Sequence, residues 1–222
     1  MKERISLIDF TRGILIILMI IYHLIYNLSE IYNVNLLFDH PFYHYAQKIV
    51  VSLFILICGV TSNFSKNNAK RGIKIFAFGL LITLVTYLYD KDFYIKFGIL
   101  HFLGLATIIY HFYRKGNYKV LFSLLGISII ITLIINNITV NTPYLFWLGL
   151  DNLAFNSSDY VPLFGFMIAF IAGNIIGKFI KEREWQGPKL ENPITTLGRH
   201  SLVIYLLHQP ILLGILYLIL GR

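Results

Sequence analysis

Charged residues and cysteines are both scarce in this sequence, and each shortage excludes a class of protein. Only 14% of the 222 residues are charged, whereas an average soluble domain has about 25%. With 57% hydrophobic residues, the chain has too few polar groups to cover a surface that faces water, so lipid must be the solvent for most of it. The single cysteine, Cys58, excludes an intramolecular disulfide and a zinc site built from cysteines.

The net charge is basic, with 19 Lys and Arg residues against 11 Asp and Glu residues. Such an excess of positive charge at first suggests a protein that binds nucleic acid. The basic residues lie in short stretches between apolar runs, and that is the pattern of membrane topology, not of a basic binding face. We therefore expect no nucleic-acid partner. Most Lys and Arg residues fall in alternate breaks between the runs, so the positive-inside bias predicts a cytoplasmic N-terminus.

Seven apolar runs are each about long enough to cross a hydrocarbon core near 30 Å thick. Because lipid offers no partner for open backbone groups, each run is predicted to be a helix. The runs cover residues 8–28, 43–64, 72–88, 97–113, 120–135, 161–180 and 201–220. The predicted fold class is all-α, a polytopic transmembrane helical bundle of about seven spans, and residues 1–222 are expected to form a single domain.

Ionisable side chains inside these runs are the best indicators of function, because burying them in hydrocarbon is costly. Asp9 and Arg12 share a face of the first run, and His23 lies about 16 Å farther along nearly the same face. His101 lies on the fourth run and His208 on the seventh. Polar groups at successive depths indicate a catalytic channel, a proton relay or a permeation path. The structural alternatives are an ion pair at the membrane edge and core histidines bonded to carbonyls.

A metal site has little support in the sequence. His40 and His44 have the i, i+4 spacing of a helix, but Pro41 between them disfavours a helix there. The sequence also has no HExxH pattern. No metal is predicted.

Four stretches of the sequence resemble one family of membrane enzymes. They read RISLIDFTRGILIILMIIYH at residues 4–23, KFGILHFLGL at 96–105, DYVPLFGFMIAFIAGNIIGK at 159–178 and LGRHSLVIYLLHQPILLGIL at 197–216. Transmembrane acyltransferases commonly open with an R-x-x-x-[IV]-D-x-x-R-G stretch, followed by an apolar helix that carries His or Asn. Together the stretches resemble the bacterial members of the heparan-alpha-glucosaminide N-acetyltransferase family over nearly the whole chain.

The resemblance implies a transmembrane acyltransferase that takes an acetyl (or other acyl) group from cytosolic acetyl-CoA and delivers it to an extracytoplasmic amino sugar or envelope glycan. It also implies an integral membrane protein of a bacterial or archaeal cytoplasmic membrane, whose partners are membrane lipid, acyl-CoA and the acceptor. The animal enzyme has more helices and a large lumenal domain, so the identity of the glycan stays open.

Site residues follow from the same resemblance. The family's proposed catalytic histidine lies in an F-x-H context shortly before the second span, and the matching stretch here is Phe38-Asp39-His40. A polar residue late in the family's first span falls on His23. We expect His40 or His23 to be the general base or a transient acyl carrier, with His101 and Asp159 orienting it or binding the acceptor.

Binding the phosphates of CoA needs cationic groups at the cytoplasmic mouth, and arginine suits phosphate because its guanidinium makes bidentate contacts. The residues expected to bind the donor are Asp9, Arg12, Lys70, Arg71, Arg199 and His208.

Two other functions would use the same residues. A transporter or channel for a small polar or anionic solute would use the polar side chains as its pathway, and a non-enzymatic scaffold would hold the histidines as satisfied core residues. Small residues at four-residue spacing within residues 165–177 allow close helix packing, either inside the chain or between the copies of a homo-oligomer.

Overall fold

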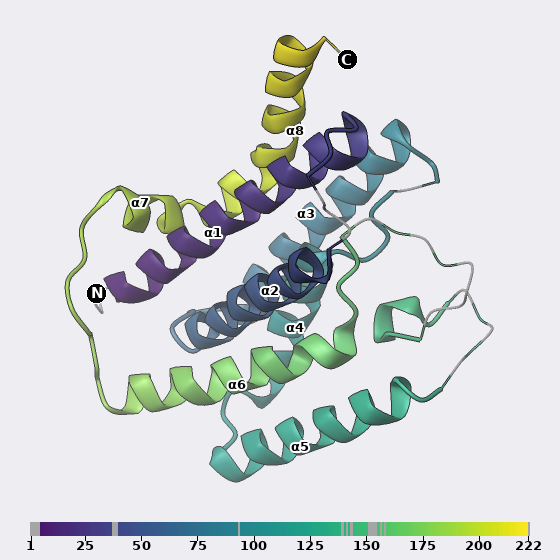
Figure 1. Cartoon of the computed structure of the whole chain (residues 1–222). Coiled ribbons are helices and arrows are strands. Elements are labelled where there is room, and N and C mark those ends of the chain that lie inside the picture. The colour runs from purple at the N-terminus through teal and green to yellow at the C-terminus, as the bar shows by residue number, and fades with distance from the viewer. Residues whose placement is uncertain are drawn as a thin grey trace. The chain divides into compact units, whose positions relative to one another are not determined.

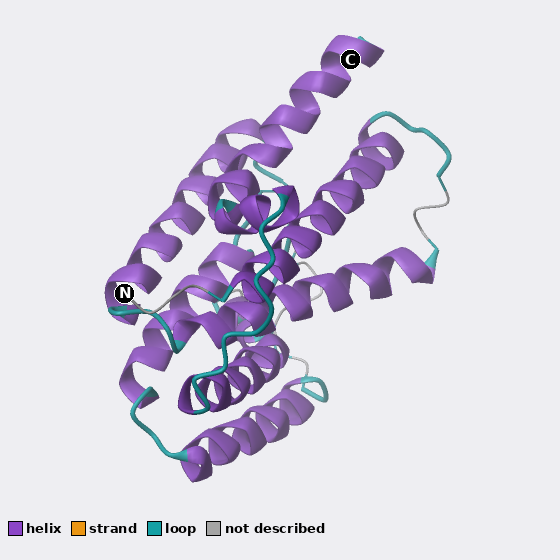
Figure 2. Ribbon diagram, turned by 90° about the vertical axis from the view of Figure 1, so that its left-hand side faces the viewer, coloured by secondary structure: helices purple, strands orange, loops and turns teal. Residues whose placement is uncertain are grey.

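The computed structural model describes residues 5–36, 40–92, 94–138, 140, 142, 144–150, 155, 157 and 159–221, which form helices and loops but no strand (Figure 1 and Figure 2). In chain order the elements are α1 (Ser6–Tyr26), η1 (Asn27–Ile31), α2 (Pro41–Ser62), α3 (Asn68–Tyr89), α4 (Ile99–Tyr113), α5 (Tyr118–Ile135), η2 (Phe146–Leu148), α6 (Leu163–Glu182), α7 (Pro193–Arg199) and α8 (Ser201–Leu220). The element η1 is a π-helix that continues α1, and η2 is a short 3₁₀ helix. The all-α prediction is confirmed.

Six helices in the described part of the chain are long and apolar enough to cross a membrane. They are Ser6–Ile31, Pro41–Ser62, Asn68–Tyr89, Tyr118–Ile135, Leu163–Glu182 and Ser201–Leu220. The remaining predicted run forms α4, which is apolar but only 15 residues long. At 1.5 Å per residue α4 measures about 22 Å, less than a hydrocarbon core of about 30 Å. The polytopic helical prediction is confirmed, whereas the cytoplasmic N-terminus stays a prediction.

Large hydrophobic side chains cover much of the outside of these spans. Leu88 on α3 is 73% exposed, and Leu218 on α8 is 83% exposed. Exposed apolar surface is unfavourable in water and favourable in lipid. The surface of the helices therefore agrees with a bilayer environment.

The chain divides into two compact units, Met1–Ile57 with Trp185–Arg222, and Cys58–Glu184. The first unit contains α1, η1, most of α2, α7 and α8. The second unit contains the last residues of α2, together with α3, α4, α5, η2 and α6. A single domain over residues 1–222 stays a prediction.

Two glycines bring α1 and α7 together in the first unit. A Cβ atom on Gly198 would lie 1.7 Å from the carbonyl oxygen of Asp9, and one on Gly13 would lie 2.0 Å from the carbonyl oxygen of Ile194. Only glycine leaves room for backbones this close. The contact places the D-x-x-R-G stretch of α1 beside the L-G-R stretch of α7, so two motifs far apart in the sequence meet in space (Figure 1).

A buried polar network organises the second unit, and we call Asn63, Tyr110, Tyr113 and Asn174 the asparagine network. The hydroxyl of Tyr110 donates to Asn63 Oδ1 at 2.7 Å, and that of Tyr113 donates to Asn174 Oδ1 at 2.8 Å. The amide of Asn63 donates to the carbonyl of Asn174 at 3.0 Å. The amide of Asn174 donates to the carbonyl of Gly59 at 2.9 Å. These bonds tie the end of α2, α4 and α6 together.

Helix α6 departs from the predicted run of residues 161–180. It begins at Leu163, and its second and third residues are not helical, because Gly165 has a φ of +94°, which only glycine adopts without strain. The amide of Gly165 donates instead to Thr132 Oγ1 of α5 at 3.0 Å. Farther along, a Cβ atom on Gly177 would lie 2.4 Å from the carbonyl oxygen of Val60. Gly177 therefore makes an internal contact, and a homo-oligomer stays a prediction.

Candidate functional site

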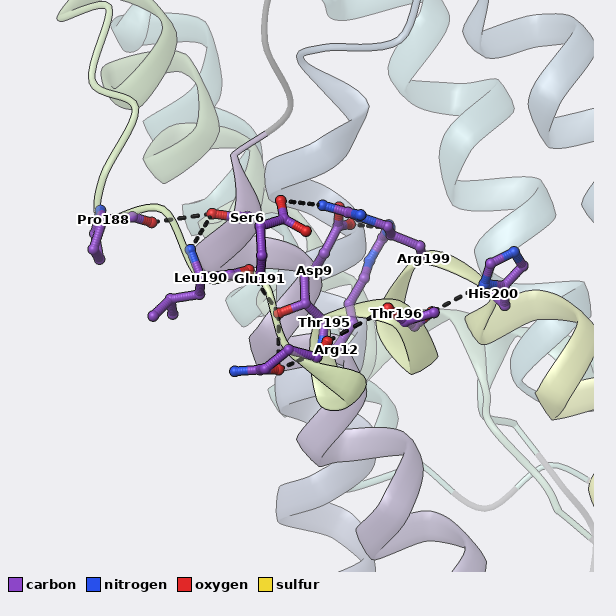
Figure 3. Close-up of polar contacts among 11 residues, drawn as sticks. Ser6, Asp9, Arg12, Pro188, Leu190, Glu191, Thr195, Thr196, Arg199 and His200 are labelled. Atoms are coloured by element: carbon purple, nitrogen blue, oxygen red, sulfur yellow. Dashed lines mark hydrogen bonds and ion pairs between the residues drawn. The ribbon is translucent and has the colours of Figure 1, made fainter.

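Four charged residues gather where α1 begins and α7 ends, and we call Asp9, Arg12, Glu191 and Arg199 the arginine cluster (Figure 3). Asp9 lies 3.8 Å from Arg12 and 3.7 Å from Arg199. The Nη2 atom of Arg199 donates to Glu191 at 2.6 Å. The structure thus brings together Asp9, Arg12 and Arg199, three of the residues predicted to bind the donor. Glu191 was not predicted, because it lies in a charged loop outside the apolar runs.

Hydrogen bonds connect the loop before α7 to α1. The hydroxyl of Ser6 donates to the carbonyl of Pro188 at 3.0 Å and accepts from the amide of Leu190 at 2.9 Å (Figure 3). Helix α7 begins at Pro193. Asn192 caps its N-terminus, because the side chain of Asn192 accepts a hydrogen bond from the amide of Thr195. These bonds hold the loop that carries Glu191 close to the arginines.

Charge in the arginine cluster is balanced, with two guanidinium groups facing two carboxylates. The carboxylate of Asp9 is 9% exposed and that of Glu191 is 66% exposed. The hydrogen bond that Arg199 donates to Glu191, and the nearby carboxylate of Asp9, raise the pKa of Arg199. Arg199 is therefore a permanent cation, and an incoming phosphate would have to compete with the exposed Glu191 for it.

The other end of α1 carries a pair of histidines. The rings of His23 on α1 and His208 on α8 have centroids 4.8 Å apart. His208 Nδ1 lies 2.6 Å from the carbonyl oxygen of Tyr205. Because a carbonyl oxygen only accepts, Nδ1 carries the hydrogen, and Nε2 holds the lone pair of the neutral ring. This bond fixes the tautomer and the orientation of an imidazole that faces a second imidazole.

Two amides close to the histidines in sequence join the same helices, and we call His23, Asn27, His208 and Gln209 the histidine–amide cluster. The amide of Gln209 donates to Asn27 Oδ1 at 2.9 Å. Asn27 is 0% exposed. Within the described part of the chain, neither Asn27 Nδ2 nor Gln209 Oε1 has a hydrogen-bond partner, although both atoms are buried. Neither residue was predicted from the sequence, although Asn27 is one helical turn after His23 and Gln209 follows His208 in the sequence.

Two predicted residues, His101 and Asp159, lie in the second unit. The amide of Gly98 donates to His101 Nδ1 at 3.2 Å. The hydroxyl of Thr83 donates to the carbonyl of Ile95 at 2.7 Å, so its oxygen accepts from His101 Nε2 at 3.1 Å. Both ring nitrogens of His101 are therefore used to hold the start of α4 against α3.

Asp159 lies at the same end of α4. A Cβ atom on Gly98 would be 3.1 Å from the Oδ2 atom of Asp159, and the amide of Val161 donates to the carbonyl of Phe97 at 3.0 Å. The backbone of Asp159 is left-handed, with a φ of +48°. A carboxylate near a helix N-terminus is electrostatically favourable. The structure thus brings Asp159 and His101 to one place, the N-terminal end of α4.

Arg71 and His40 stand apart from these groups. Arg71, in the second unit, donates to Thr61 Oγ1 at 3.4 Å. His40, in the first unit, is exposed, and its Nδ1 accepts from the amide of Phe42 at 3.2 Å where α2 begins. The described residues show no hydrogen bond or ring contact between His40 and His23. The rest of the predicted F-x-H stretch, residues 38 and 39, lies outside the described residues.

Comparison with known proteins gives a match to a family model. The family model described as "Heparan-alpha-glucosaminide N-acetyltransferase, catalytic" matches residues 4–210. The matched region includes the arginine cluster, the histidine–amide cluster and the asparagine network. No curated protein and no solved structure matches the chain.

Proposed function

Because this chain belongs to the heparan-alpha-glucosaminide N-acetyltransferase family, we propose that it is a membrane enzyme that transfers acetyl from acetyl-CoA to an amino sugar or envelope glycan. The donor binds from the cytoplasmic side and the acceptor from the opposite side of the membrane. The donor, the acceptor and the direction of transfer are the parts of this proposal that go beyond membership of the family.

One observation supports the proposal most strongly: α1 carries two polar clusters of different chemistry. The arginine cluster lies at its N-terminal end, and the histidine–amide cluster lies at its C-terminal end. Eleven residues separate Arg12 from His23, which is about 16 Å along the helix. A CoA thioester has the same division, because its pantetheine arm separates the phosphates from the reacting carbonyl.

The arginine cluster suits the phosphates of the donor. Arg12 and Arg199 supply planar donors that match phosphate oxygens. In the proposed binding mode the phosphates displace the exposed carboxylate of Glu191 from Arg199, while Asp9 stays buried and keeps the two guanidinium groups oriented. Arg71 is in the other unit and is proposed only as a secondary contact.

The histidine–amide cluster suits the transfer itself. In the proposed reaction an imidazole, His23 in our assignment, takes a proton from the acceptor amine while the nitrogen attacks the thioester carbonyl. The tetrahedral intermediate then collapses, the carbon–sulfur bond breaks, and the proton returns to the leaving thiolate. The products are an N-acetyl group and CoA. His208, held by the carbonyl of Tyr205, orients His23 and faces the developing charge.

The remaining predicted residues receive smaller roles. We assign His101 a positioning role, because both of its nitrogens already bind groups of the protein. Asp159 lies at the same end of α4 and is proposed to bind the acceptor. His40 is exposed beside the N-terminus of α2 and is the alternative base if His23 proves dispensable.

The test is a transfer assay with the purified protein in detergent. Acetyl-CoA and glucosamine are supplied, and the free CoA thiol and N-acetylglucosamine are both measured. We expect the two products to form in equal amounts. Absence of transfer to any amino sugar, whether or not acetyl-CoA binds, would overturn the proposal. Solute flux in proteoliposomes without donor would favour a transporter.

A further inference from the structure

The side-chain amides of Asn27 and Gln209 form one hydrogen bond with each other, and each has one atom left that forms none. Gln209 Nε2 donates to Asn27 Oδ1 at 2.9 Å. The opposite atoms, Asn27 Nδ2 and Gln209 Oε1, are buried without a partner among the described residues. One unused donor and one unused acceptor therefore remain at the same place. In hydrocarbon such groups are costly, since no water is there to bind them.

The presence of one unused donor and one unused acceptor does not depend on how the two amides are oriented. The oxygen and nitrogen of an amide side chain are assigned from the hydrogen bonds around them. If both amides are turned over, Asn27 Nδ2 donates to Gln209 Oε1, and Asn27 Oδ1 and Gln209 Nε2 remain. In either arrangement the pair is left with one donor and one acceptor.

The position of the pair also sets it apart from an ordinary contact between helices. Asn27 is the first residue of the π-helix η1, and such segments often occur at functional sites. His23 lies one turn before Asn27, and His208 precedes Gln209 on α8. The bond between Asn27 and Gln209 and the ring contact between His23 and His208 therefore join α1–η1 to α8 within one helical turn of each other along the chain.

We propose that Asn27 and Gln209 bind a secondary amide of a ligand, whose carbonyl accepts from one side chain while its N–H donates to the other. This inference rests on the proposed acetyl transfer, because both ligands of that reaction carry secondary amides. CoA has them in its pantetheine arm, and the product has one in its new acetamide group. Either ligand would place an amide beside His23 and His208.

The experiment removes both amides without leaving either one alone. The variant Asn27→Leu/Gln209→Met keeps the shape of both side chains, and replacing both partners of a hydrogen bond by apolar groups is close to neutral for stability. Dissociation constants for CoA, N-acetylglucosamine and glucosamine are measured for this variant and for the wild type. Helix content and thermal unfolding establish that the variant folds. If it does not, Gln209→Met alone, at a half-buried position, supplies the comparison.

The outcomes separate the two sources of the amide. Binding of CoA weakened about tenfold to a hundredfold, as expected for lost hydrogen bonds, assigns the pantetheine arm. The same loss for N-acetylglucosamine, with glucosamine unaffected, assigns the acetamide. Unchanged constants for all three ligands, failure of the wild type to bind CoA and N-acetylglucosamine, or equal loss for glucosamine would overturn the inference. Binding of CoA without acetyl transfer would contradict the proposed function instead.

Discussion

The asparagine network and the histidine–amide cluster use the same kind of side chain in opposite ways. In the asparagine network, every amide atom of Asn63 and Asn174 has a partner in the protein, either a backbone carbonyl or a tyrosine hydroxyl. In the histidine–amide cluster, Asn27 and Gln209 share one hydrogen bond, and a buried donor and a buried acceptor have no partner among the described residues.

The difference separates polar groups that stabilise from polar groups that bind. A buried network whose bonds are complete fixes the packing of its helices and has no capacity for a ligand. A buried pair whose bonds are incomplete costs stability until something binds to it. His101 and His208 differ in the same direction: both nitrogens of His101 hold α4 in place, whereas His208 faces the ring of His23.

The largest effect should come from His23→Ala. If His23 is the base, its loss should lower kcat by about 10²–10⁴-fold, the usual contribution of general acid–base catalysis, while helix content and thermal stability stay close to wild type. His44→Ala, at an exposed position on α2, is the matched control and should keep full activity. Equal activity of the two variants would remove His23 from the mechanism and direct attention to His40.

Removing an amide from the complete network should cost stability. Asn174→Leu removes the acceptor of the Tyr113 hydroxyl and the side-chain donor to the carbonyl of Gly59. At about 1–3 kcal/mol for each lost partner, the two losses cost about 2–6 kcal/mol. The free energy of unfolding in mixed micelles measures this loss. The activity per folded molecule should change little. A stable variant with no activity would instead place Asn174 in the site.

Adding a side chain at the glycine contact between α1 and α7 should destabilise the protein. In Gly198→Ala the new Cβ atom would overlap the carbonyl oxygen of Asp9, and overpacking of this kind costs about 1–3 kcal/mol. Gly214→Ala on α8, where a Cβ atom meets nothing within 4 Å, should match the wild type or exceed it by less than about 1 kcal/mol. Thermal unfolding of the two variants provides the comparison, and equal stability would mean that α1 and α7 are not in backbone contact.

The smallest effect is expected in the arginine cluster. Glu191→Gln removes the exposed carboxylate that occupies Arg199, so the dissociation constant for CoA should fall about two- to fivefold, as for an exposed ion pair. High salt should abolish the difference. The permanent charge of Arg199 makes this effect independent of its own titration. Weaker binding of CoA by Glu191→Gln would show that the carboxylate orients Arg199 for the donor.

Most of the fold follows from the sequence, because long apolar runs have few alternatives to a helix in lipid. Every predicted run contains a helix, and His23 and His208 were identified because imidazoles are unusual in such runs. The short length of α4 and the late start of α6 were not predictable. The first depends on how residues 94–98 pack, and the second on the bond between Gly165 and Thr132.

The site was harder to predict than the fold. Asn27 and Gln209 are neutral, so a search for charge inside apolar runs passes over them, and their unused atoms become visible only in three dimensions. The arginine cluster needed the close contact of Gly13 and Gly198, which joins two motifs from opposite ends of the chain. The role of His101 depended on Thr83 and Gly98, and no spacing in the sequence indicates those bonds.

A structure of the protein with acetyl-CoA bound tests the central claim most directly. We expect the thioester carbonyl beside His23 and His208, and the phosphates at Arg12 and Arg199 in place of Glu191. If the pantetheine arm is the source of the bound amide, one of its amides should lie at Asn27 and Gln209. A donor bound in the second unit, with its thioester at His101 and nothing at the histidine–amide cluster, would contradict the account.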